Sequence, residues 1–267
     1  MEGEVMSLTS GPSISELCDA LGKASERYAG MLRQVKDPAP PAVGSWNVGD
    51  TAVHTAVSSS YFLMVAQGQS EPLSVDSDHK TYFETNLDVN FEALAERFTA
   101  GERALIDYAR GLDGDPEVEI FKGVIIPTSA LMAVELCEVL VHGYDIAKAS
   151  GLDWQIPKPE AALAIEGLLP LWAYGVDSKS AAGLKARFEL RIRGGVRKVL
   201  AFDEGRLTFE EPSDIPADCY LSIDPVALLL LSFNRIQPWG PMLQGKMGAW
   251  GRRFWLAGKF PSLFKGI

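Results

Sequence analysis

The feature that most constrains the fold of this chain is a change in the spacing of its apolar residues near Gly151. Before that point, apolar residues recur at helical spacing in four long segments, whereas several later segments alternate apolar and polar residues. Four long helices in succession are typical of a bundle, and short alternating segments between glycine turns indicate strands. The sequence therefore predicts the α+β class, with a four-helix bundle over residues 1–155 and an α+β domain over residues 156–267.

The predicted helices of the first half have recognisable ends. Ser13 followed by Glu16 indicates a capping box at the start of the first helix, and three prolines between residues 37 and 45 prevent it from continuing. The third helix is expected to turn its charged residues, Glu102 among them, toward water. The four predicted ranges are 13–36, 48–67, 87–112 and 127–149.

The second half is predicted to mix helices and strands. After a linker, a helix is expected over residues 161–174, and strands follow within residues 186–211 and 218–223. Asp224, with Pro225 at the first helical position, opens an apolar helix that ends near Phe233. The remaining residues are expected to form short turns and a final amphipathic segment.

Charge and composition exclude several classes of protein. The net charge of −10 and the isoelectric point near 4.9 oppose binding to a phosphate backbone, so no nucleic-acid partner is expected. The longest apolar run, Val226 to Leu231, is far shorter than the roughly 20 residues that span a bilayer, and the first residues lack the features of a secretory signal. The sequence therefore predicts a cytoplasmic protein without a transmembrane segment. Its three cysteines, at positions 18, 137 and 219, suit a reducing compartment and are expected to be buried.

Three side chains have the spacing of metal ligands. Glu138 and His142 are four residues apart, so on a helix they lie on one face, and Asp145 continues that face. His54 lies on a separate apolar helix and is the candidate for a third ligand, whereas His79 lies in a polar loop and is expected to be solvated. Two nitrogens and one oxygen would hold zinc with one position open for water or a substrate, as in catalytic sites. The alternative is that both helical histidines are ordinary core residues.

These residues also carry a resemblance to a known family. The run Trp46 to His54, WNVGDTAVH, followed by Glu138 to Asp145, resembles the signature of the mycothiol-dependent maleylpyruvate isomerase family. The resemblance implies a DinB-like four-helix bundle in which His54, Glu138 and His142 hold a divalent metal, usually zinc. It also implies that the metal activates the thiol of mycothiol, a small thiol of actinobacteria, for attack on an electrophile. Asp145 would then support the ligands or cap the bundle, and Cys137 would only pack.

The second half resembles the sterol-carrier-type domain that follows the bundle in this family. The resemblance implies that Arg235 helps bind an anionic substrate, although Asn234 occupies the position of the family's usual glycine. The alternative is that Arg235 is a helix C-terminal charge favoured by the helix dipole.

The function predicted first is a metal- and thiol-dependent isomerase or S-transferase that binds a small thiol and an electrophilic substrate. Two alternatives remain at this stage. One is a metal-dependent hydrolase that uses water in place of thiol. The other is an apolar-ligand carrier with a vestigial bundle, in which Trp239, Trp250 and Trp255 line a tunnel, unless they are only core residues and surface anchors.

Overall fold

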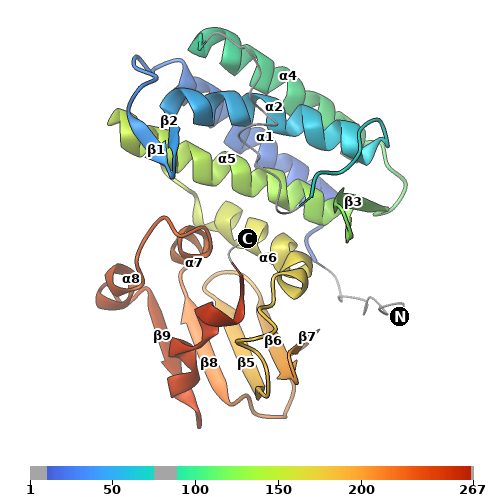
Figure 1. Ribbon diagram of the computed structural model, residues 1–267, viewed down its shortest axis with the longest axis vertical. Helices are drawn as coiled ribbons and strands as arrows, with labels where there is room; N and C mark the ends of the chain where they lie inside the picture. Colours follow the sequence, from blue (N-terminus) through green and yellow to red (C-terminus); the bar gives the residue numbers. More distant parts are fainter. Residues whose placement is uncertain (1–10, 75–88, 266–267) are drawn as a thin grey trace. The chain divides into compact units, whose positions relative to one another are not determined.

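A computed structural model describes residues 11–74 and 89–265 of the chain. The chain divides into two compact units, one formed by Pro12–Ile156 and one that contains Pro157–Ile267 (Figure 1). The predicted polar loop around His79 lies outside the described residues. Within the described residues, no helix is long and apolar enough to cross a membrane.

Four long helices build the first unit. Helices α1 and α2 each contact both α4 and α5, and Figure 1 shows the four helices side by side. Their shared core is filled by large side chains that are completely buried, among them Leu17, Tyr28, Phe98 and Leu131. The helices are α1 (Ile14–Leu32), α2 (Val48–Ala66), α4 (Phe91–Arg110) and α5 (Thr128–Ser150).

The ends of these helices follow the sequence signals closely. The capping box at the start of α1 is present, because Ser13 Oγ accepts from the backbone N–H of Glu16 and the Glu16 carboxylate accepts from that of Ser13. Helix α1 ends at Leu32, four residues before the predicted end, since Arg33 to Val35 form turns that lead into the proline-rich segment. The prediction that Glu102 faces water is wrong. Glu102 is only 2% exposed, because α4 is covered by both α1 and α2.

Two short hairpins, which the sequence analysis did not predict as strand pairs, connect these helices. Strands β1 and β2 form an antiparallel pair directly before α2, and β3 and β4 form another directly before α5. Each hairpin therefore leads into a helix that carries part of the candidate site. The strands are β1 (Pro41–Val43), β2 (Trp46–Asn47), β3 (Glu117–Phe121) and β4 (Val124–Pro127).

A five-stranded sheet forms the centre of the second unit. Its strand order is β7-β6-β5-β8-β9, and all neighbouring strands are antiparallel except β5 and β8, which are parallel. Phe188, Leu200 and Cys219 are completely buried in this sheet. The strands are β5 (Lys185–Ile192), β6 (Arg197–Asp203), β7 (Arg206–Glu210), β8 (Cys219–Ile223) and β9 (Met247–Trp250).

One helix of this unit precedes the sheet strands in the sequence, and two more lie between β8 and β9. Helix α6 begins at Lys158, three residues before the predicted start, because Pro157 caps it and Pro159 fits its first turn. Strand β9 corrects the prediction that the C-terminal segment contains only turns and an amphipathic end. The α+β class itself is confirmed. The helices are α6 (Lys158–Tyr174), α7 (Pro225–Ser232) and α8 (Trp239–Leu243), followed by the 3₁₀ helices η1 (Phe254–Gly258) and η2 (Phe260–Leu263).

Candidate metal centre

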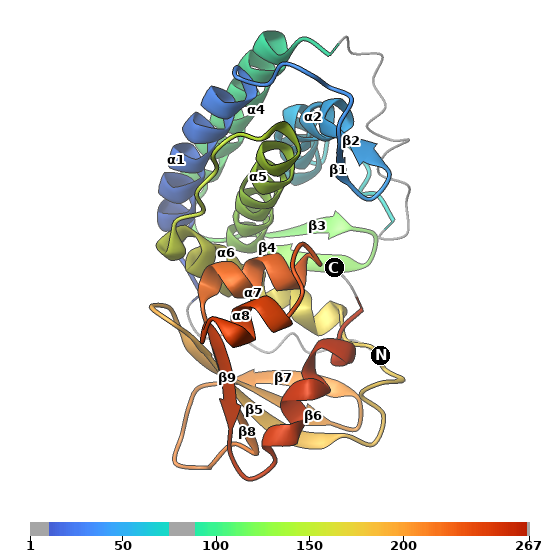
Figure 2. The ribbon, with the colours of Figure 1, turned by 90° about the vertical axis from the view of Figure 1, so that its left-hand side faces the viewer.

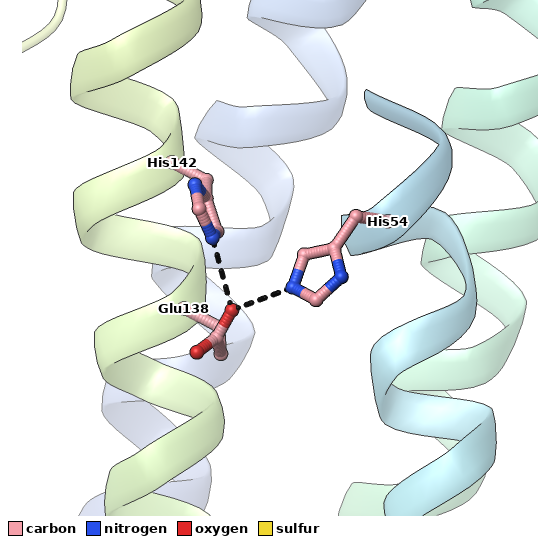
Figure 3. Close-up of side chains that lie close together, drawn as sticks. All are labelled: His54, Glu138 and His142. Carbon is pink, nitrogen blue, oxygen red and sulfur yellow. Dashed lines mark hydrogen bonds and ion pairs between the residues drawn. The ribbon is translucent and has the colours of Figure 1, made fainter. Parts of the chain in front are cut away.

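Three potential metal ligands converge between α2 and α5. His54 lies in the second turn of α2, and Glu138 and His142 lie one turn apart on α5. Oε2 of Glu138 is 3.0 Å from Nε2 of His54 and 3.1 Å from Nε2 of His142 (Figure 3). One ligand atom from each side chain lies within 4.8 Å of the other two. Two nitrogens and one oxygen therefore lie close together at one place in the helical unit.

The local structure before α2 holds His54 in place. Asn47 caps the helix, since its Oδ1 accepts from the backbone N–H of Asp50, whose carboxylate accepts in turn from that of Asn47. The preceding residue, Trp46, packs its ring against both imidazoles, with centroids 4.7 Å from His54 and 6.1 Å from His142. The cap and the indole therefore restrict the orientation of the histidines before any ligand binds.

Asp145 fixes the orientation of His142. Its Oδ2 is 3.1 Å from Nδ1 of His142, and the residue is only 4% exposed. A histidine ligand that donates one ring N–H to a carboxylate presents its other nitrogen to the metal with a defined tautomer and direction. The structure thus provides the support for His142 that the sequence analysis expected of Asp145.

The charges of the site are strongly coupled. Burial alone would raise the pKa of Glu138, but hydrogen bonds with His142 and His54 outweigh it and hold this pKa well below its usual value. Burial alone would lower the pKa of His142, yet hydrogen bonds with Asp145 and Glu138 raise it to about 9. Without a metal, the site therefore keeps an ionised Glu138 beside a protonated His142. A bound cation would take the place of that proton.

Both contacts of Glu138 have about the length expected between neighbouring ligand atoms of a zinc ion. With bonds of about 2.0–2.2 Å in a tetrahedral arrangement, neighbouring ligand atoms around zinc lie roughly 3.3 Å apart. The separations of 3.0 and 3.1 Å between Glu138 and the two histidines are close to that value. Glu138 is also the least buried of the three, with 23% of its side chain exposed against 10% and 11% for the histidines. Solvent therefore reaches the site beside the carboxylate.

Arg235 lies in the other compact unit, directly after α7. Its Nη1 donates to the backbone oxygen of Phe233 at 2.6 Å, and Phe233 is the residue at the C-terminal cap of α7. Arg235 therefore lies near the end of a helix, as in the alternative in which it serves as a helix C-terminal charge. Asn234 adopts a left-handed conformation, with φ of 58°. Asn tolerates this conformation better than most non-glycine residues do, so Asn234 can hold the backbone turn at this position.

A polar cluster one helical turn from the site was missed by the sequence analysis. Ser58, one turn after His54, donates to Oε1 of Glu135 at 2.9 Å, and Glu135 lies three residues before Glu138. Glu135 in turn lies beside Glu102, and burial raises the pKa of both carboxyl groups. The one signal in the sequence is the run Ser58 to Ser60 within an otherwise apolar helix.

The cysteines are not part of the site. Cys137 is 1% exposed, and burial raises the pKa of its thiol well above the usual value, so it remains protonated and packs as a small apolar group. All three cysteines are buried, as expected from the sequence.

The second unit contains a cavity of its own. It has a volume of about 440 Å³ and lies between α7 and α8. Apolar side chains, among them Leu230 and Ile236, form much of its wall, together with Asp224 and Lys246. Ile236, which lines this cavity, directly follows Arg235 in the sequence.

Comparison with known proteins gives a likeness of fold. No protein-family profile matches the chain, and no curated protein matches it significantly. Among solved structures, the mycothiol-dependent maleylpyruvate isomerase has a TM-score of 0.52 and 16% identity, over 86% of this chain and 94% of that one. A variant of that enzyme with one histidine replaced by alanine gives 0.50 and 15%, over 85% and 93%. A ubiquinone synthesis protein, UbiJ-SCP2, gives a TM-score of 0.30 and 21% identity, over 41% of this chain and 93% of that one. The likeness to the isomerase shows that the two chains share a fold.

Proposed function

We propose that this protein is a zinc-dependent enzyme that activates a small thiol, of the mycothiol type, for isomerisation of or transfer to a small electrophilic substrate. The observation that carries this proposal is the convergence of His54, Glu138 and His142 from two helices. The fold shared with the mycothiol-dependent maleylpyruvate isomerase supports it. The three residues would hold the metal, and the metal would supply the charge that lowers the pKa of a bound thiol.

The residues of the chain have separate roles in this proposal. Asp145 orients His142, Trp46 shields the two imidazoles, and the exposed side of Glu138 leaves the path by which a thiol enters. Arg235 binds a carboxylate of an anionic substrate such as maleylpyruvate.

The first experiment is the metal content of the full chain, purified without a histidine tag and measured by mass spectrometry. We expect about one zinc per chain, as three protein ligands require. His54→Ala and Glu138→Gln should each lose the metal and the thiol-dependent activity. Arg235→Ala should keep the metal but bind the anionic substrate more weakly.

Glu135→Gln is the matched control for this experiment. It changes another buried carboxylate on α5, three residues away, while an amide oxygen can still accept from Ser58. Zinc and activity should both remain in this variant. A folded protein that takes up no zinc, or one whose zinc survives His54→Ala, would contradict the proposal. Assays with maleylpyruvate and with alkylating electrophiles then separate isomerase from S-transferase.

The cavity between α7 and α8 favours a second candidate function, an apolar-ligand carrier. Its walls combine apolar side chains with Asp224 and Lys246, which suits a ligand with a polar head. A carrier would bind a fluorescent fatty acid equally well in the parent protein and in the His54→Ala variant. Binding of that kind, in a protein without zinc or thiol-dependent activity, would favour the carrier over the enzyme.

A further inference from the structure

The exposed apolar side chains of the described residues gather in one short part of the chain. Eleven large hydrophobic side chains are exposed, and six of them lie between Trp239 and Trp255. Leu243 is 90% exposed, Trp239 68% and Trp255 62%. Large apolar side chains that gather in this way on a surface are typical of interaction sites. The six are Trp239, Met242, Leu243, Trp250, Phe254 and Trp255.

These residues belong to three consecutive elements at the edge of the second unit's sheet. Helix α8 leads into β9, which is the last strand in the sheet order, and β9 leads into η1. Figure 2 shows α8 and β9 on the same side of this unit. The ring of Trp250 stacks on Tyr220 with centroids 5.5 Å apart, and the guanidinium of Arg191 lies 5.0 Å from both rings. We call α8, β9 and η1 together the aromatic edge.

The charge of this part of the chain is opposite to that of the rest. Six of the 25 Lys and Arg residues follow Asp224 in the sequence, whereas none of the 35 Asp and Glu residues does. Among them, Lys246, Arg252 and Lys259 are exposed. The residues between and directly after the elements of the aromatic edge therefore add positive charge to it, on a chain whose net charge is −10, and one of them, Arg252, is paired with Asp218 at 2.8 Å.

We propose that the aromatic edge docks onto the surface of anionic phospholipid membranes. Trp is enriched at the membrane interface, where its ring lies at the level of the headgroups. Basic residues add attraction to anionic lipid, and Leu243 and Met242 supply aliphatic groups that enter the acyl boundary. The acidic residues elsewhere in the chain are repelled by the same surface, so the aromatic edge is the segment expected to approach it.

Two other partners fit the same observations less well. Single-stranded nucleic acid is bound by stacking on aromatic rings, which leaves the exposed Leu243 and Met242 without a role. A second copy of the chain would bring two cationic edges together, which like charges oppose. Binding of an oligonucleotide in place of vesicles, or dimerisation that depends on Leu243, would therefore overturn the proposal.

The test is co-sedimentation of the full chain with two kinds of vesicle, one of phosphatidylcholine alone and one with phosphatidylglycerol added. We expect binding to the anionic vesicles only, with a loss of binding at high salt. Lys246→Gln combined with Lys259→Gln should lower the partition coefficient roughly 30-fold, since each basic residue near the surface contributes about fivefold. Trp239→Ser combined with Leu243→Ser should also abolish most of the binding.

Matched controls come from the helical unit. Replacement of Ile125 on β4, which is 46% exposed, by Ser tests the loss of an exposed apolar side chain. Lys23→Gln with Arg97→Gln tests the loss of two exposed charges. These variants should bind as the parent does. Quenching of tryptophan fluorescence by brominated lipid should be much weaker in Trp239→Ser with Trp255→Ser, in which Trp250 is the remaining exposed tryptophan of the edge. Equal binding to both vesicles, no binding, or lysine and tryptophan variants of the aromatic edge that bind like the parent would each refute the proposal.

Discussion

The nitrogen of His142 that faces away from Glu138 is 3.1 Å from Oδ2 of Asp145. Asp145 is not one of the three candidate ligands. Its contact with Nδ1 nevertheless decides how His142 presents the lone pair of Nε2. Glu102 is the opposite case, a buried carboxyl group that lies beside another acid, Glu135.

Asp145→Asn should weaken zinc binding without unfolding the protein. Outer partners of histidine ligands typically contribute 10–100-fold in metal affinity, so we expect a loss in about that range. Competition with a chromogenic chelator measures it, and circular dichroism checks the fold. An affinity equal to that of the parent would show that the contact with His142 has no role in metal binding.

Glu102→Gln should change how stability depends on pH. Burial raises the pKa of Glu102 from 4.5 to about 7, so the folded protein holds a proton that the unfolded chain releases above pH 4.5. The contribution of Glu102 to the free energy of unfolding is therefore fully present below pH 4.5 and is lost as the pH rises through 7. At about 1.4 kcal/mol per pH unit, the loss is on the order of 3 kcal/mol.

Gln has the size of the protonated carboxyl group and cannot ionise, so the variant should lose most of this fall and exceed the parent in stability above pH 7. Urea unfolding across this pH range measures the effect. Glu96→Gln, an exposed change on the same helix, is the control and should leave the pH dependence unchanged. Parallel curves for parent and Glu102→Gln would contradict the explanation.

At the scale of elements, spacing and caps predicted α1, α2, α4 and α5, but not how closely their surfaces approach. Gly143 on α5 shows such an approach, because a Cβ there would collide with the indole of Trp154. Trp154 lies in the predicted linker after α5, and its Nε1 donates to the backbone oxygen of Leu140 at 3.0 Å. Periodicity gives no information on a linker side chain that folds back onto a helix, so the sequence did not reveal this contact.

Gly143→Ala should lower the free energy of unfolding by roughly 1–3 kcal/mol, the usual cost of overpacking, even though Ala favours a helix. Gly30→Ala on α1 is the matched control, since a Cβ there meets nothing within 4 Å. That variant should gain about 1 kcal/mol from helix propensity. Denaturant unfolding of both proteins measures the difference. A gain in both variants would mean that Trp154 can move away at little cost.

At the scale of the whole molecule, the chain consists of two compact units, each with its own buried residues. The net charge of −10 describes the sum of both units and conceals the cationic aromatic edge of the second. A ligand that binds only the folded state stabilises that state. A metal held between α2 and α5 should therefore stabilise the helical unit.

Zinc should raise the unfolding temperature of the helical unit alone. At a concentration one hundred times its dissociation constant, a ligand adds about 2.7 kcal/mol to the free energy of unfolding. Calorimetry of the full chain should show one transition that moves with zinc and one that does not. In Glu138→Gln neither should move. A shift of both transitions in the parent would mean that the two units unfold together or that zinc binds elsewhere.

The sequence alone determined the local structure of this protein and the types of its candidate ligands. The spacing of apolar residues sets which conformation buries them, and Ser13 with Glu16 satisfies the backbone groups at the start of α1. The helices and the i, i+4 pair of Glu138 and His142 could therefore be predicted. Only the tertiary structure decided what depends on packing between distant segments. His54 and Glu138 are 84 residues apart, and helix packing brings them within 3.0 Å. The burial of Glu102 and the exposure of the aromatic edge were decided in the same way, because burial depends on what covers a residue and not on the residue alone.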